Sequence, residues 1–280
     1  MSAAMPHIPA NSVSISTRET ATHIAYHAVL DHTSDYLYQV SVAQLTEHLE
    51  VLRGAAGLTS ADAPLPSISF DDGYRSDFEH AFPLLQACGL QATFFVLPGM
   101  IGVSADCISW QHAKLMISAG HRIESHGWSH GMLTQYSAAE LEREIIASKL
   151  EIENRLGRPV TSLSAPGGRW DERVVELCAR AGYETLFHSN PWAPARRING
   201  VWVSGRLMVT RKMRGIDLLR FANAGRIDRL RQRAKFAAKR SVRKALGEDF
   251  YHALWCRLAR FRPNDGIELN MDLERSVSPE

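Results

Sequence analysis

The chain has 280 residues, of which 45% are hydrophobic and 22% are charged, and its formal net charge is +2. These values are ordinary for a globular protein, and the length suffices for one large domain, with or without an appendage. The four cysteines form no CxxC pair, so we expect reduced thiols, which excludes a disulfide framework.

No stretch of the sequence approaches the roughly eighteen uninterrupted apolar residues that a membrane-spanning helix needs. The N-terminal residues also lack the basic region and the apolar region of a signal peptide. We therefore expect a cytoplasmic protein, either free or held at the inner face of the membrane.

Predicted strands and helices alternate along the chain after an expected loose tail at residues 1–20. Apolar runs of β-type residues predict strands at 24–30, 67–70, 92–97, 121–125, 161–166, 185–189 and 201–209. Apolar spacing, N-caps and closing glycines predict helices at 41–57, 76–89, 109–120, 137–157 and 171–182. The alternation predicts an α/β domain with parallel strands over residues 21–222, but it does not distinguish an open sheet from a closed barrel. The absence of a GxGxxG motif argues against dinucleotide binding.

Residues 223–280 are expected to form a basic helical C-terminal extension. Residues 224–247 are rich in Lys and Arg and carry a weak apolar stripe of Ile227, Leu230, Ala234 and Ala237. The favoured interpretation is a helix that packs against the domain through this stripe. The alternative is peripheral contact with an anionic membrane, where each Lys or Arg contributes about 1 kcal/mol. No nucleic-acid binding is expected, because no reader fold or aromatic platform is recognised.

Two adjacent carboxylates, Asp71 and Asp72, follow the predicted strand 67–70 and precede Gly73. Side chains at the carboxyl ends of parallel strands converge on a common pocket. Carboxylates so close repel each other, so a cation is needed to keep both ionised. One carboxylate could then hold a metal ion while the other acts as a base. Taken alone, the motif could equally be a solvated Asp-Gly turn.

Two histidines, His126 and His130, lie four residues apart just after the predicted strand 121–125. This spacing lets both imidazoles bind one ion. Together with Asp72 they would form a two-histidine, one-carboxylate site. Such a site leaves a coordination position open, as a catalytic metal requires.

A third motif, Ala165-Pro166-Gly167-Gly168-Arg169-Trp170, contains glycines that let the backbone come close to a ligand. Together with SISFDDGYRSDFEHAFPLLQACGLQATFFVLPG and HRIESHGWSHGMLT, it resembles the motif regions of the polysaccharide deacetylase family, also called the NodB-homology or carbohydrate esterase family 4 domain. The resemblance extends over residues 20–205. It implies a distorted (β/α) barrel with about seven parallel strands, a divalent metal ion, for which Zn²⁺ is expected, and hydrolysis of an N-acetyl group on a sugar.

The resemblance also assigns roles to individual residues. It makes Asp71 the catalytic base and places the backbone N–H of Gly167 at the oxyanion. The expected metal ligands are Asp72, His126 and His130. The other residues expected to line the substrate site are Tyr74, Trp128, Trp170 and His188.

The sequence departs from the family pattern in two places. The third motif usually carries an Arg that orients the base, and Ser164 or Ala165 holds that place here. The late Leu-x-His motif that usually supplies the acid is absent. The pair Tyr26-His27 instead resembles a circularly permuted branch in which a Tyr-His motif on the first strand supplies the acid. His27 is therefore the expected acid, with a core histidine as the alternative and His188 as the reserve candidate.

The expected substrate is an N-acetylated glycan, either an exopolysaccharide or a lipid-linked glycan. Two other functions stay open, namely hydrolysis of a small linear or cyclic amide within the same superfamily and glycan binding by a decayed site. The Tyr-His start and the basic region favour the glycan over the small amide. The intact Asp71 and metal ligands argue against decay, because buried charges are costly to retain without a use.

Overall fold

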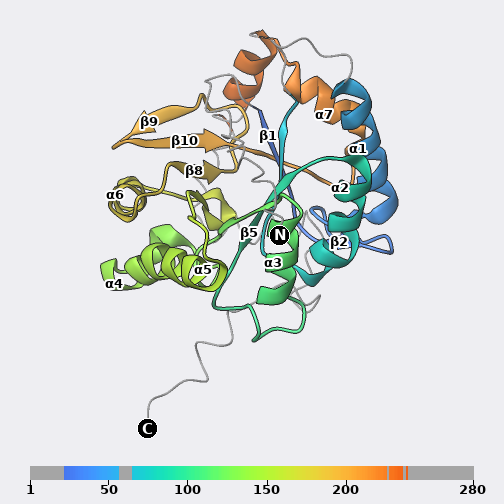
Figure 1. Cartoon of the computed structure of the whole chain (residues 1–280). Coiled ribbons are helices and arrows are strands. Elements are labelled where there is room, and N and C mark those ends of the chain that lie inside the picture. Colours follow the sequence, from blue (N-terminus) through green and yellow to red (C-terminus); the bar gives the residue numbers. More distant parts are fainter. Residues whose placement is uncertain (1–21, 57–64, 226, 236–237, 239–280) are drawn as a thin grey trace, which may run out of the picture.

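The computed structural model describes residues 22–56, 65–225, 227–235 and 238 (Figure 1). The strands are β1 (His23–Tyr26), β2 (Val29–Leu30), β3 (Val40–Ser41), β4 (Ser67–Phe70), β5 (Ala92–Val96), β6 (Arg122–Ser125), β7 (Ser162–Ser164), β8 (Thr185–His188), β9 (Arg196–Ile198), β10 (Val201–Gly205) and β11 (Leu207–Met208). The α-helices are α1 (Val42–Ala56), α2 (Phe82–Cys88), α3 (Trp110–Ser118), α4 (Ala138–Glu142), α5 (Ser148–Leu156), α6 (Glu172–Ala181) and α7 (Gly215–Ala222). Short π-helical segments are η1 (Asp77–Ala81) and η3 (Arg143–Ala147), and 3₁₀ turns are η2 (Leu133–Gln135) and η4 (Pro166–Gly168).

Nine strands form one curled sheet in the order β11-β1-β4-β5-β6-β7-β8-β10-β9. Every neighbouring pair is parallel except β10 and β9. Helices α1 to α6 lie around the outside of this sheet, and α7 lies beside α1 (Figure 1). The expected distorted (β/α) barrel is thereby confirmed, and a parallel strand overlaps each of the seven predicted ranges.

The segment 201–208 contributes one strand to each end of the parallel part of the sheet. Its first part, β10, pairs with β8, and its second part, β11, pairs with β1. Arg206 is the residue between β10 and β11, and it is only 2% exposed. The closure of the barrel therefore carries a charged side chain into its interior.

Aromatic side chains of neighbouring strands stack on one face of the sheet. The ring of Phe70 on β4 lies 5.2 Å from that of Tyr26 on β1 and 5.0 Å from that of Phe94 on β5, and all three residues are buried. Successive side chains of a strand point to opposite faces. Asp71, which follows Phe70, therefore points to the other face, where Arg206 lies.

Three predicted elements differ in detail from those in the structure. The predicted strand 24–30 is interrupted, because β1 ends at Tyr26 and Val29–Leu30 pairs with β3 in a separate sheet. The predicted helices 76–89 and 137–157 contain the π-helical segments η1 and η3. The break after Tyr26 matters for the site, because it frees the next residue from the sheet at the barrel mouth.

Strand β9 and helix α7 were not predicted. β9 has three residues, two of which are exposed arginines, so it shows no apolar alternation. α7 has eight residues, too few to establish helical periodicity in the sequence. The three cysteines in the described part of the chain are free, as expected, and Cys256 lies outside it.

The C-terminal extension is described only in part, and the expected tail at residues 1–20 lies outside the described residues. Residues 227–235 form a helix, here called the basic helix. The expected packing of its apolar stripe is wrong for Ile227 and Leu230, which are 69% and 66% exposed. Arg229 faces the domain instead, because its guanidinium donates to the carbonyl oxygens of Ala222, the last residue of α7, and of Ala224, which follows that helix. No helix in the described ranges is long and apolar enough to cross a bilayer.

Candidate active site

The two adjacent carboxylates lie at the carboxyl end of β4. The backbone N–H of Asp71 donates to the carbonyl oxygen of Tyr26 at 2.9 Å, which makes Asp71 the last residue held by β1. Asp72 and Gly73 then take φ angles of +73° and +64°, and the chain turns away from the strand. Both carboxylates are buried side by side, where the sequence analysis placed them.

Asp72, His126 and His130 converge at this strand end. Their ligand atoms lie within 4.8 Å of one another. The Nε2 atoms of His126 and His130 lie 3.2 and 3.1 Å from the same atom, Oδ1 of Asp72. This oxygen is buried and has no hydrogen bond to the described residues, which suits an atom that binds a cation. Two imidazole nitrogens and one carboxylate oxygen are a donor set that fits a divalent ion such as Zn²⁺.

Electrostatics keep the Asp72 carboxyl group ionised. Burial raises its pKa, but the imidazoles of His130 and His126 outweigh burial and hold the pKa well below its usual range. Burial lowers the pKa of His130, yet the Asp72 carboxylate outweighs burial there too and raises it. The cluster is therefore built around a fixed negative charge.

The orientation of both histidines is defined by the backbone. Nδ1 of His126 lies 2.8 Å from the carbonyl oxygen of Ser164 on β7. A carbonyl oxygen only accepts, so Nδ1 carries the proton and Nε2 is left to bind a metal ion. His130 adopts a φ angle of +70°, which is uncommon for a residue other than glycine and brings its ring to Asp72.

Glu144 on η3 holds the loop between the two histidines. Its Oε2 accepts the backbone N–H groups of Trp128 and Ser129 at 2.7 and 3.1 Å, and its Oε1 accepts the Ser129 hydroxyl at 2.6 Å. Gly127 is required here, because it has a φ of +86° and a Cβ atom would lie 2.9 Å from Oε2. Glu144 was not predicted as a functional residue, because it has no distinguishing feature inside the predicted helix 137–157.

Arg206 binds the Asp71 carboxylate through two parallel hydrogen bonds. Its Nη1 donates to Oδ1 at 2.8 Å and its Nη2 donates to Oδ2 at 2.6 Å. The same guanidinium lies over the rings of Phe95 and Phe187, 4.9 and 5.5 Å from their centroids. This forked geometry fixes both the position and the orientation of the carboxylate.

Ser164 is one of the two residues at the place where the resemblance leads us to expect an Arg, and it lies between Arg206 and Asp71. Its Oγ is 2.6 Å from Nη2 of Arg206 and 3.2 Å from Oδ2 of Asp71. Burial raises the pKa of Asp71, but Arg206 outweighs it and leaves that pKa lowered. Arg206 was not predicted as a functional residue. The signal that could have identified it is a single charged residue within the apolar run VWVSGRLMV.

His27 directly follows β1, and the pairing of Tyr26 with Phe70 places it beside Asp71 at the adjacent strand end. Its ring contacts that of Tyr38 at 5.3 Å, and its buried Nδ1 has no hydrogen bond to the described residues. Burial lowers the pKa of His27, against the opposing effect of the Asp72 and Asp71 carboxylates. The imidazole is therefore within electrostatic range of the site.

His188 lies at the end of β8 and is buried. Its Nδ1 accepts the backbone N–H of Asn190 at 3.0 Å, and its ring stacks on Trp170 at 6.1 Å. Burial, with help from Arg206 and Arg196, lowers the pKa of His188 to about 4. The imidazole is thus neutral near pH 7, and it lies at the carboxyl end of β8 beside Trp170.

The remaining predicted residues follow the strand ends. Tyr74 is buried, and burial together with the Asp72 carboxylate raises its pKa well above the usual range. Trp128 is partly exposed and lies under the Arg143 guanidinium at 5.4 Å. Gly167 is exposed in η4 with a φ of +60°, a conformation that the Pro-Gly-Gly sequence permits. Trp170 lies between His188 and the guanidinium of Arg196.

Residues 60–186 match the family model described as polysaccharide deacetylase. YxkH from Bacillus subtilis (strain 168), whose name assigns it to the polysaccharide deacetylases, is 30% identical over 148 residues, which are 53% of this chain and 52% of that protein. The peptidoglycan-N-acetylglucosamine deacetylase PgdA of Listeria monocytogenes is 27% identical over 111 residues, 39% of this chain and 23% of PgdA. The chain thus spans about half the length of the first relative and less of the second.

Solved structures share the fold. The Streptococcus pyogenes deacetylase PplD in complex with acetate has a TM-score of 0.66 and 20% identity, and the match covers 72% of this chain and 98% of that one. IcaB from Ammonifex degensii has a TM-score of 0.62 and 22% identity, with 73% and 97% covered. The resemblance seen in the sequence is confirmed: residues 60–186, which contain the three motifs, match the polysaccharide deacetylase family model.

Proposed function

We propose that the protein is a metal-dependent hydrolase that removes N-acetyl groups from the amino sugars of a polysaccharide or lipid-linked glycan. The observation that carries this proposal is the position of Asp71. Its carboxylate, held ionised by Arg206, directly precedes the ligand cluster of Asp72, His126 and His130. An oriented base beside a metal centre is what hydrolysis of an unactivated amide by water requires.

The three clustered side chains would hold the ion, for which we propose Zn²⁺. When bound, the ion supplies a Lewis acid that polarises the acetyl carbonyl and lowers the pKa of water. Two sets of contacts support this role. His126 donates a hydrogen bond to the Ser164 carbonyl oxygen, and Glu144 accepts hydrogen bonds from the loop between the two histidines. These contacts fix the positions of the histidine ligands before a metal binds.

The protein groups then move two protons. Asp71 takes a proton from the attacking water as the new C–O bond forms at the acetyl carbon. The backbone N–H of Gly167 donates a hydrogen bond to the carbonyl oxygen as that oxygen gains negative charge. His27 donates a proton to the amide nitrogen, so the C–N bond breaks and the products are acetate and a free amino sugar.

Aromatic side chains at the barrel mouth support a sugar as the substrate. Trp128 and Trp170 are partly exposed at the ends of β6 and β7, and Tyr74 follows β4. Rigid aromatic faces give a large apolar contact at small entropic cost and suit the faces of sugar rings. We propose that these residues, with His188, line the substrate site.

The test is mass spectrometry of N-acetylated oligosaccharides after incubation with the full chain, with and without a chelator. Loss of acetyl groups together with release of acetate, abolished by chelation and restored by Zn²⁺, is the expected result. Release of ammonia from small cyclic or linear amides, without acetate, would move the function to amide hydrolysis. Saturable binding of the oligosaccharides without turnover in the Zn²⁺-loaded protein would instead indicate a glycan-binding protein.

A further inference from the structure

The basic helix is oriented opposite to an ordinary surface helix. Its half-buried side chains are the polar Arg229 and Gln232, whereas its apolar Ile227, Leu230 and Ala234 are exposed. A surface helix of a globular protein normally turns its apolar stripe toward the core. The apolar residues here recur three and four positions apart, so they form one continuous stripe that faces away from the domain.

Specific contacts hold the helix in this orientation. Arg229 Nε donates to the carbonyl oxygen of Ala224 at 2.9 Å, and its Nη2 reaches that of Ala222. Arg233 Nε donates to the carbonyl oxygen of Trp192 at 2.6 Å. These three carbonyl oxygens belong to the domain and to its junction with the helix, so the polar face is the anchored face.

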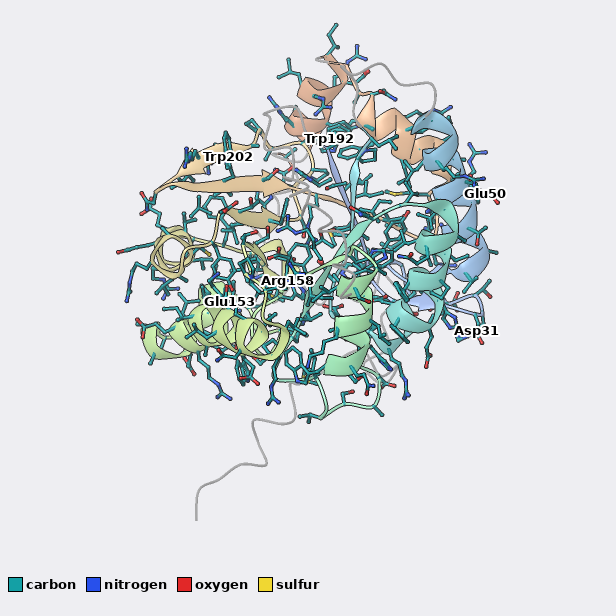
Figure 2. The ribbon with its side chains drawn as sticks, viewed as in Figure 1. Asp31, Glu50, Glu153, Arg158, Trp192 and Trp202 are labelled. Atoms are coloured by element: carbon teal, nitrogen blue, oxygen red, sulfur yellow. The ribbon has the colours of Figure 1, made fainter. Side chains whose placement is uncertain are left out.

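The helix is anchored close to the mouth of the barrel. Trp192 lies in the loop that begins after His188, at the carboxyl end of β8, and its ring packs edge-on against Phe221 of α7 at 5.1 Å. Figure 2 labels Trp192 in the upper part of the molecule, where α7 and the basic helix lie. Asp71 and Asp72 also lie at the carboxyl ends of the parallel strands, after β4.

Basic side chains flank the exposed stripe. Arg231 and Lys235 are exposed, and Asp228 is the one acidic residue in the described part of the helix. A stripe of apolar residues bordered by Lys and Arg is the pattern of a helix that lies in the interface of an anionic bilayer. A second copy of the same helix is a poor partner, because two strongly basic surfaces repel each other.

We propose that the outward stripe of Ile227, Leu230 and Ala234 docks on an anionic lipid bilayer, with Arg231 and Lys235 at the headgroups. Docking in this orientation brings the barrel mouth next to the membrane surface. The docking itself does not depend on the proposed deacetylase function, and it is measured without substrate. A failure of one proposal therefore leaves the other intact.

The experiment is sedimentation of the full chain with vesicles of phosphatidylcholine, with and without phosphatidylglycerol, at low and high salt. Binding to the phosphatidylglycerol vesicles that weakens with salt is expected. Arg231→Gln with Lys235→Gln should weaken binding by roughly 30-fold, which corresponds to about 1 kcal/mol for each basic residue. Ile227→Ser with Leu230→Ser should weaken binding at least about tenfold, because both side chains leave the apolar phase.

The matched control is Leu115→Ser with Leu150→Ser, which replaces two half-exposed leucines on α3 and α5 and should leave binding unchanged. An equal loss of vesicle binding in the control would show that binding depends on general surface hydrophobicity and not on the stripe, which would overturn the proposal. Absence of vesicle binding by the full chain would overturn the proposal. So would dimerisation that depends on Ile227 and Leu230, measured by light scattering, or a fall in melting temperature in the serine variant, because the stripe would then cover a protein surface.

Discussion

Arg206 and Asp71 form a forked ion pair with both side chains buried, at 2.8 and 2.6 Å between their paired atoms. The two residues are 135 positions apart, and the closure of the barrel brings them together. Arg206 lowers the pKa of Asp71 against the effect of burial. The pair therefore links the last parallel strand to the protonation state of the proposed base.

Arg206→Gln should move the acid limb of the pH dependence of kcat/KM to higher pH. Removing the cation raises the pKa of Asp71, so the ionised base appears only at higher pH. Turnover at neutral pH should fall about 10²-fold or more, within the range of general-base effects. Arg206→Lys, which keeps the charge, should restore the acid limb. Arg197→Gln on β9 is the matched control, because that arginine is exposed and donates to the carbonyl oxygen of Gly200. An acid limb at the same pH in Arg206→Gln would contradict the coupling.

Asp71→Asn should fold and bind metal, but its turnover should fall about 10²–10⁴-fold, because an amide cannot accept the proton of the attacking water. The ligand cluster does not include Asp71, so metal content by elemental analysis should stay at the wild-type level. A variant with near-native kcat would show that another group serves as base.

His126→Ala should lower the metal affinity by more than the roughly 10–100-fold that loss of an outer hydrogen-bond partner costs, because a direct ligand is removed. We expect about one divalent ion for each wild-type chain and much less for the variant after dialysis, measured by elemental analysis. His32→Ala removes an exposed histidine outside the cluster and should keep the ion. Equal metal content in the wild type, His126→Ala and His32→Ala would show that His126 does not bind a metal ion.

The strand-end motifs were predictable because parallel strands bring distant local motifs to one edge. Asp72 and His126 each follow a short apolar strand, and β4, β5 and β6 are neighbours in the sheet. Arg206 was not predictable in this way, because its partner is set by how the barrel closes. The left-handed backbone conformation of Asp72 and His130 could not be predicted either, because neither residue type requires a positive φ angle.

The strand 24–30 shows how tertiary context overrides propensity. Its seven residues are mostly apolar or aromatic, and the sequence favours one continuous strand. In the structure β1 ends at Tyr26 and Val29 pairs with Val40 in a different sheet. The break leaves His27 at the barrel mouth. The basic helix is a second case, because the backbone carbonyls that anchor Arg229 and Arg233 determine its orientation and no sequence pattern reveals them.

Acid should destabilise the protein through His23. Its Nδ1 lies 2.6 Å from Ser67 Oγ, and burial together with Arg206 lowers its pKa to about 4. The unfolded chain, with a pKa of about 6.5, binds the proton first, so stability is complete above about pH 6.5 and is lost as the pH falls toward 4. The loss attributable to His23 is at most about 3 kcal/mol. His23→Gln should show a shallower fall in urea unfolding free energy between neutral pH and pH 4 than wild type or His32→Gln. A slope as steep as that of the wild type would exclude His23 as the cause.

The leaving amine requires a proton before the C–N bond can break. His27 and His188 both lie at strand ends, and burial lowers the pKa of each imidazole. The carboxylates of Asp72 and Asp71 oppose this shift at His27, whereas Arg206 and Arg196 add to it at His188, whose pKa falls to about 4. The neighbouring carboxylates favour the protonated form of His27, so we expect His27 rather than His188 to supply the proton.

His27→Ala should depress kcat far more than it changes KM, because protonation of the leaving nitrogen matters only in the transition state. An acid is active while protonated, so activity falls as the pH rises through its pKa. The variant should therefore lose the alkaline limb of the pH–rate profile while its metal content stays unchanged. His188→Ala, the matched variant, should keep the alkaline limb and change mainly KM, because Trp170 loses the ring on which it stacks. If the two variants exchanged these behaviours, His188 would be the acid and His27 a residue of the barrel wall.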